Sequence, residues 1–153
     1  MTSAMRTVVT FQSSKFNATE SREYYINPGC FGDDLCRWLI AELNSLDFRC
    51  EPDPEQEDFG WYCSFTIDDT QYRFVCGYRP QDGDDPGTWI AWIERSTGFI
   101  SSLFGGANRG IQMKALQQIH LVLSRCPEIH NIRWHTKDNF DKGIEDAGAS
   151  EPG

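Results

Sequence analysis

Two runs of strict alternation between apolar and polar residues constrain the fold of this chain more than any other feature. In the first run, residues 59–67, apolar side chains occupy every odd position. In the second run, residues 71–79, aromatic and cysteine side chains occupy the even positions. A period of two places one face of a strand against a core. With the turn-like residues 68–70 between them, the two runs predict a hairpin, which a third strand over residues 88–95 extends into an antiparallel meander.

Two amphipathic helices are predicted, one on each side of this meander in the sequence. In residues 31–46, leucines and a tryptophan recur at three- and four-residue steps, the spacing of one helical face. Asp33 and Asp34 suit the first turn of this helix, where carboxylates meet free N–H groups. A second stripe runs through residues 111–125, and the Cys-Pro pair that follows ends it.

Shorter strands are expected over residues 5–11, 23–27, 47–50 and 129–135, and no second domain is apparent in a chain of 153 residues. Two amphipathic helices need an apolar sheet face to cover. We therefore predict an α+β fold: an antiparallel sheet of about five to seven strands with two amphipathic helices packed on one face. Residues 1–140 form this single domain, and residues 141–153 are an acidic tail expected to be disordered. The predicted interface joins strand residues Trp61, Phe65, Phe74 and Ile93 to helix residues Leu39, Leu43, Ile119 and Val122.

The formal net charge of −9 is concentrated in three segments. Five acidic residues lie within residues 51–58, three within 82–85 and four in the tail, so the remaining chain is close to neutral. A negative field repels phosphate, which disfavours nucleic-acid binding, and it attracts basic proteins. The leading hypothesis is a non-enzymatic binding module of the bacterial cytosol, immunity- or inhibitor-like, with acidic loops facing a basic protein partner. Plain solubility is the alternative explanation of the charge.

The six cysteines include no C-x-x-C pair, so a structural zinc site is not expected. Residues 1–11 lack the apolar core of a signal peptide, and no apolar run approaches the ~20 residues of a membrane span. A cytoplasmic location with reduced cysteines follows as the expectation. No motif for a nucleotide, a calcium loop or a hydrolase nucleophile is present, and no cofactor is predicted.

The candidate binding site lies where the acidic segment meets the first long strand. There, Glu57 or Asp58 would pair with Arg73 or Arg79 on the next strand, and the cluster would bind a polar ligand or act in acid–base chemistry. The alternative is that these carboxylates only hold the loop. The candidate binding residues are Glu55, Glu57, Asp58, Trp61, Arg73, Arg79, Trp89 and Trp92.

A rival hypothesis is a small-molecule-binding domain or enzyme. Its pocket would be lined by Tyr78 and three of the tryptophans, Trp61, Trp89 and Trp92. The apolar segment from Phe99 to Phe104 allows three roles: a lid, a docking patch or a core plug.

Three short segments carry a resemblance: QEDFGWY at residues 56–62, WIAWIER at 89–95 and RWH at 133–135. With them the chain resembles small uncharacterised bacterial proteins, and this resemblance implies no activity.

Overall fold

The computed structural model describes residues 5–20, 22–26, 29–57, 60–80, 87–96, 111–137, 140 and 148–152. These residues form seven strands and two helices, which confirms the predicted α+β class. In chain order the elements are β1 (Arg6–Ser13), α1 (Asp33–Ser45), β2 (Arg49–Cys50), β3 (Glu55–Glu57), β4 (Gly60–Ile67), β5 (Thr70–Arg79), β6 (Thr88–Arg95), α2 (Met113–Ser124) and β7 (Ile129–Thr136).

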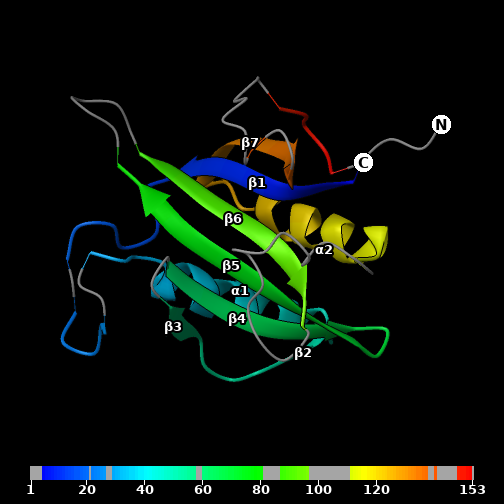
Figure 1. The fold of residues 1–153 in the computed structure, drawn as a ribbon, viewed down its shortest axis with the longest axis horizontal. Helices are drawn as coiled ribbons and strands as arrows, with labels where there is room; N and C mark the ends of the chain where they lie inside the picture. Colours follow the sequence, from blue (N-terminus) through cyan, green and yellow to red (C-terminus); the bar gives the residue numbers. More distant parts are fainter. Residues whose placement is uncertain are drawn as a thin grey trace.

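All seven strands belong to one antiparallel sheet with the order β2-β4-β5-β6-β1-β7, and β3 pairs with β4 beside β2 (Figure 1). The meander of β4, β5 and β6 is therefore confirmed. The first strand in the sequence, β1, lies between β6 and β7, and none of its ladders involves the strands nearest to it in the chain.

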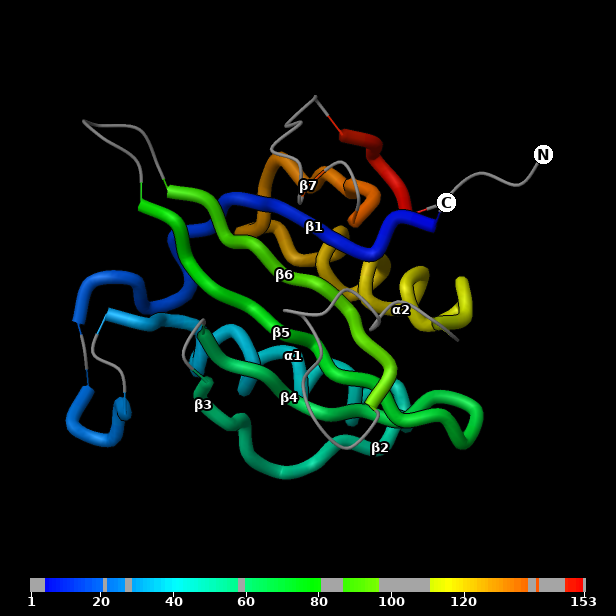
Figure 2. Tube along the Cα trace, in the orientation of Figure 1, coloured from blue at the N-terminus to red at the C-terminus, as the bar shows by residue number. Residues whose placement is uncertain are grey.

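Both helices pack on one face of the sheet, as Figures 1 and 2 show. The eight residues predicted to form the interface between strands and helices all belong to one buried cluster. Alternation explains this outcome, because the odd residues of β4 and the even residues of β5 point to the same side. Trp89, Trp134 and Tyr72 are the largest fully buried side chains and fill the space beneath the helices.

The strand predicted over residues 23–27 is wrong for its described part. Residues 23–26 form turns, and the Tyr25 N–H donates to the Arg22 carbonyl at 3.0 Å. The aromatic and β-branched composition of this stretch is typical of a strand. However, the hydroxyl groups of Tyr24 and Tyr25 bond to Asp33, and this contact curls the chain towards the start of α1.

Two other segments differ from expectation. The acidic segment predicted as a loop contains β3, because the outer edge of β4 offers unpaired backbone groups next to it. In the tail, residues 148–152 lie against the sheet: Trp134 and Ala149 exchange backbone hydrogen bonds of 2.7 and 2.8 Å. The segment from Phe99 to Phe104 lies outside the described residues. Neither of the described helices has the length and apolar character needed to cross a membrane.

Candidate functional site

Four exposed carboxylates follow one another at alternate positions along the sheet margin next to β4: Glu51, Asp53, Glu55 and Glu57. We call this set the acidic edge. The last two belong to β3, whose pairing with β4 fixes their direction, and the buried Pro54 anchors the chain between the first pair and the second. The fifth acid of the segment, Asp58, lies outside the described residues.

A glycine lets β3 and β4 approach β5 at this point. Gly60 has a φ of +154°, and a Cβ there would lie 2.0 Å from the carbonyl oxygen of Cys76. Any other residue would therefore displace the start of β4. This close approach fixes the start of β4, with which the two acids of β3 pair.

The prediction paired Glu57 or Asp58 with Arg73 or Arg79; what the structure describes at Arg73 is an indirect link to Glu55 through Tyr62. Glu55, not Glu57, accepts a hydrogen bond from the Tyr62 hydroxyl, and the Arg73 guanidinium lies 5.6 Å from the centre of the Tyr62 ring. Burial and then the bond to Glu55 raise the pKa of Tyr62 to about 12, so its hydroxyl keeps the proton that it donates. Arg79 is exposed at the C-terminal end of β5.

The guanidinium of Arg73 has unused hydrogen-bonding capacity. Only 7% of this residue is exposed, and within the described part of the chain its Nη1 has no hydrogen-bond acceptor. Directly opposite on β6, Glu94 has no exposed surface. The Glu94 Oε1 accepts a 2.9 Å bond from the Trp92 indole, whereas its Oε2 has no donor among the described residues. Buried polar groups are rarely left unpaired, so this pair of residues calls for an explanation.

A cavity of about 410 Å³ adjoins the acidic edge on this face of the sheet. Its lining is mostly polar and includes Glu51, Asp53, Glu55, Tyr62, Gln71 and Arg73. The lining thus combines three carboxylates with one guanidinium. Such a cavity can accommodate a molecule that carries both signs of charge.

The four aromatic residues of the predicted pocket do not come together. Trp61 and Trp89 are buried under the helices, and their indoles donate to the carbonyls of Cys30 and Ser13 at 2.8 and 3.4 Å. Trp92 lies three residues after Trp89 on the same strand, so its side chain points to the opposite face. Tyr78 packs on Trp89 with ring centres 4.9 Å apart. Trp61, Trp89 and Tyr78 therefore belong to the core under the helices, whereas Trp92 lies on the other face, and the four do not line a common pocket.

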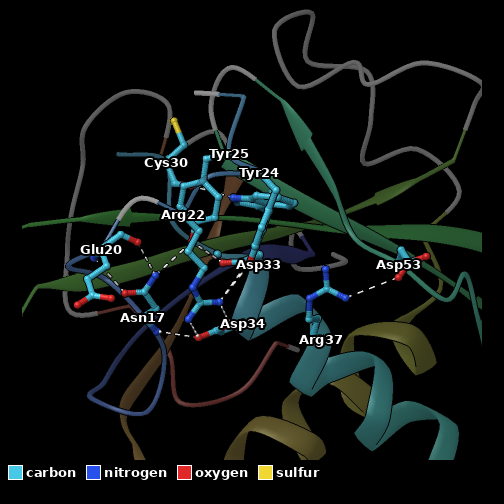
Figure 3. Close-up of polar contacts among 12 residues, drawn as sticks. Asn17, Glu20, Arg22, Tyr24, Tyr25, Cys30, Asp33, Asp34, Arg37 and Asp53 are labelled. Atoms are coloured by element: carbon cyan, nitrogen blue, oxygen red, sulfur yellow. Dashed lines mark hydrogen bonds and ion pairs between the residues drawn. The ribbon is translucent and has the colours of Figure 1, made fainter. Parts of the chain in front are cut away.

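Sequence reasoning missed a polar network at the start of α1, which Figure 3 shows in close-up. Asp33 has no exposed surface and accepts hydrogen bonds from Tyr24, from Tyr25 at 2.6 Å and from Arg22 at 3.3 Å. Arg22 also bonds to both oxygens of Asp34, at 2.7 and 3.1 Å. Burial alone would raise the pKa of Asp33, but the two tyrosine bonds and the charge of Arg22 outweigh it and lower the pKa. The sequence signal was an Arg and two Tyr shortly before a helix that begins with two Asp.

Two large apolar side chains are exposed in the turn that contacts β3 through Gln56. Ile26 is 77% exposed and Tyr24 is 51% exposed. The Ile26 N–H donates to Oε1 of Gln56 in β3 at 2.6 Å, which holds this turn against the edge. The other exposed large apolar residue of the described chain, Leu121, lies on α2. Apolar anchors next to charged groups are typical of protein-binding surfaces.

A second cavity, of about 730 Å³, lies at the C-terminal end of β1. Its lining includes Phe16, Tyr78, His130 and two charged residues, Lys15 and Asp34. Lys15 pairs with Glu128 at 3.4 Å, and Asp34 pairs with Arg22. Because both charges are already compensated, this cavity presents a weaker electrostatic signal than the one at Arg73.

Three buried cysteines meet beneath α1, and they show no sign of a reactive site. The sulfurs of Cys36 and Cys76 are 3.7 Å apart, and the free thiol of Cys63 forms a hydrogen bond with that of Cys36. Burial, and next the two neighbouring thiols, raise the pKa of Cys36 well above its ordinary value, which disfavours the nucleophilic thiolate. Among the described residues, no group of His, Cys, Asp or Glu side chains is placed to hold a metal ion.

The comparisons with known proteins give one family. The model described as "Domain of unknown function (DUF4304)" matches residues 2–82, which span β1 to β5 and include both the acidic edge and Arg73. No curated protein and no solved structure matches the chain. The match includes the QEDFGWY segment, whereas WIAWIER and RWH lie beyond it. Since the match covers more than half of the residues, the chain belongs to the DUF4304 family.

Proposed function

We propose that this chain is a protein-binding module that receives a basic surface of a partner protein at its acidic edge. The observation that carries the proposal is the coincidence of two features in one place. Four exposed carboxylates lie along β3 and the segment before it, and the turn that carries the exposed Tyr24 and Ile26 is hydrogen-bonded to Gln56 of β3. Interfaces commonly combine an apolar anchor with a charged rim.

One acid of the acidic edge, Asp53, is only weakly neutralised by its own chain. Asp53 has an ion pair with Arg37 at 3.6 Å, in which both side chains are more than half exposed. Exposed pairs of this kind contribute little energy, so a partner's cations can replace Arg37 at small cost. Complementary charge would mainly raise the rate of association and select basic partners.

The acidic edge is also held in a defined shape before binding. Strand pairing fixes β3, the Tyr62 hydroxyl holds Glu55, and Gln56 ties down the turn that carries Ile26. A preorganised surface loses little conformational entropy on binding. An immunity- or inhibitor-like protein that covers a basic site on its partner is the concrete form of the proposal.

The test compares two variants with the same change in net charge. E51Q/D53N/E57Q neutralises the acidic edge but keeps the Glu55–Tyr62 bond, and E20Q/E128Q/E151Q removes three exposed acids elsewhere. Each protein is immobilised, exposed to native lysate and analysed by mass spectrometry. We expect basic proteins that bind the parent and the control but not the edge variant, with association slowing as salt is raised.

The apolar part is tested by Ile26→Ser, which should speed dissociation of the same partner by about tenfold while association changes little. The proposal fails if the edge variant and the control retain the same proteins with the same kinetics. It also fails if the control no longer captures the same proteins that the edge variant no longer captures, because binding would then depend only on net charge.

A further inference from the structure

The cavity beside the acidic edge is lined by side chains of both signs of charge. Glu51, Asp53 and Glu55 supply carboxylates, and Arg73 supplies a guanidinium that is nine-tenths buried. The acids alone would indicate only a cation-attracting surface. The arginine is the second, independent observation, because its Nη1 has no acceptor within the described residues.

A buried guanidinium without an anion is costly, and the strongest complement to it is a carboxylate held by two parallel hydrogen bonds. Two protein carboxylates lie near Arg73. Glu55 is occupied by the Tyr62 hydroxyl, and Glu94 accepts from the Trp92 indole. Glu94 keeps a free Oε2 opposite Arg73, but it forms no ion pair with Arg73 among the described residues and does not line the cavity. A carboxylate that reaches Arg73 from the cavity would therefore come from a ligand.

A simple anion does not suit the cavity, since the three carboxylates would repel it. A ligand that also carries a cation avoids this penalty by placing its positive group at the acids. Lysine and arginine with a free α-carboxylate have this charge pattern, and a volume of about 410 Å³ suits a single residue of their size.

We propose that the cavity binds a carboxyl-terminal lysine or arginine of the partner protein, with the α-carboxylate on Arg73 and the side-chain cation between Glu51, Asp53 and Glu55. The inference rests on the proposed function, because it takes the ligand to be part of a protein that docks at the acidic edge. It specifies that the partner's last residue is the one recognised. The α-carboxylate on Arg73 distinguishes this residue from an internal lysine or arginine.

The test uses two peptides that differ in one group, acetyl-Gly-Gly-Arg with a free carboxylate and the same peptide as the carboxamide, titrated calorimetrically. We expect the free acid to bind at least about tenfold more tightly, the usual effect of a hydrogen bond between charged groups. In Arg73→Gln this preference should disappear, because only the acid loses affinity. In E51Q/D53N both peptides should lose affinity by a similar factor, whereas E20Q/E128Q should behave like the parent.

Equal affinity of the parent for the acid and the amide overturns the inference, and this comparison needs no variant to fold. A preference that survives in Arg73→Gln, or in Arg73→Lys if the first variant is unfolded, overturns the role of Arg73. Free L-arginine is the third probe. If it binds as tightly as the peptide, the assignment to a protein terminus is overturned in favour of a free amino acid.

The outcome is separable from that of the proposed function. Capture of a basic partner that depends on the acidic edge, together with equal binding of acid and amide, would reject this inference alone. A clear preference for the acid peptide, together with capture that ignores the edge variant, would reject the protein-binding proposal alone.

Discussion

The network at the start of α1 and the face of the sheet opposite the helices each hold a carboxylate with no exposed surface. Asp33, in the network, accepts hydrogen bonds from two tyrosines and an arginine. Glu94, on the sheet, accepts one bond from Trp92, and its second oxygen has no donor among the described residues. Arg73, which lies opposite Glu94, is left unsatisfied in the same way.

The difference separates a structural polar cluster from a candidate site. Burying a charge is offset only when its hydrogen-bonding capacity is filled. The residues around Asp33 meet that condition, so this network stabilises the fold and has little left to offer a ligand. The pair of Arg73 and Glu94 does not meet it, and Arg73 lines a cavity, where a ligand can supply an acceptor for its guanidinium.

The largest expected effect is at Asp33. Asp33→Asn removes the charge that Arg22 and both tyrosines stabilise, and it should lower the free energy of unfolding by about 3 kcal/mol. Chemical denaturation measures this loss. Asp34→Asn is the matched control, because the Asp34 side chain is 31% exposed, and its loss should be about 1 kcal/mol. Equal losses in the two variants would contradict the assignment of the network to the scaffold.

Acid should reproduce part of this effect. The folded-state pKa of Asp33 is lowered, so the stability it contributes is complete above the unfolded pKa of about 3.9. That contribution is lost as the pH falls through the folded-state pKa. Denaturation curves at pH values from about 7 down to about 3 should therefore converge for the parent and Asp33→Asn. A gap that stays constant over this range would show that protonation of Asp33 is not involved.

The corresponding change on the sheet should have a much smaller effect. Glu94→Gln keeps the acceptor for Trp92 and removes an incompletely paired charge, so the free energy of unfolding should change by at most about 1 kcal/mol, and an increase is expected. The same denaturation assay applies. A loss as large as that of Asp33→Asn would mean that Glu94 has partners as effective as those of Asp33, which would remove the contrast between the regions.

The smallest effect on stability is expected at the acidic edge. E51Q/D53N/E57Q should change the free energy of unfolding by no more than about 0.5 kcal/mol, because exposed charges contribute little. A thermal melt is sufficient to test this. A marked drop in melting temperature would assign these carboxylates to the scaffold and remove the basis for a partner-facing surface.

Patterns within one element predicted most of the fold. Alternation gave β4, β5 and β6, and helical spacing gave α1 and α2, because burial on one face imposes these periods. The turn at Tyr24 and Tyr25 was missed, since its aromatic composition suits a strand and its real partner, Asp33, lies eight or nine residues away. A local pattern does not contain such a contact.

For the site, the sequence predicted which types of residue come together but not which individual residues do so. The sequence indicated that acids before β4 would meet an arginine on β5, but the choice of Glu55 depends on the register in which it pairs with Tyr62. A shift of one residue would have turned Glu55 away from the ring. The juxtaposition of Arg73 and Glu94 likewise depends on the register of β5 and β6, which residues outside the two strands help to set.

The hydrogen bond of 3.3 Å from the Arg6 N–H to the Pro152 carbonyl has a practical consequence. It places both ends of the described chain beside β1 and β7, whereas β3 lies at the opposite margin of the sheet (Figure 2). A dye, a surface linker or a fused protein attached at either end would therefore project away from the acidic edge. Two copies joined through these ends would present their acidic edges outward. Such a bivalent protein would dissociate more slowly from an immobilised partner than a single copy does, so that a weakly binding partner could be captured.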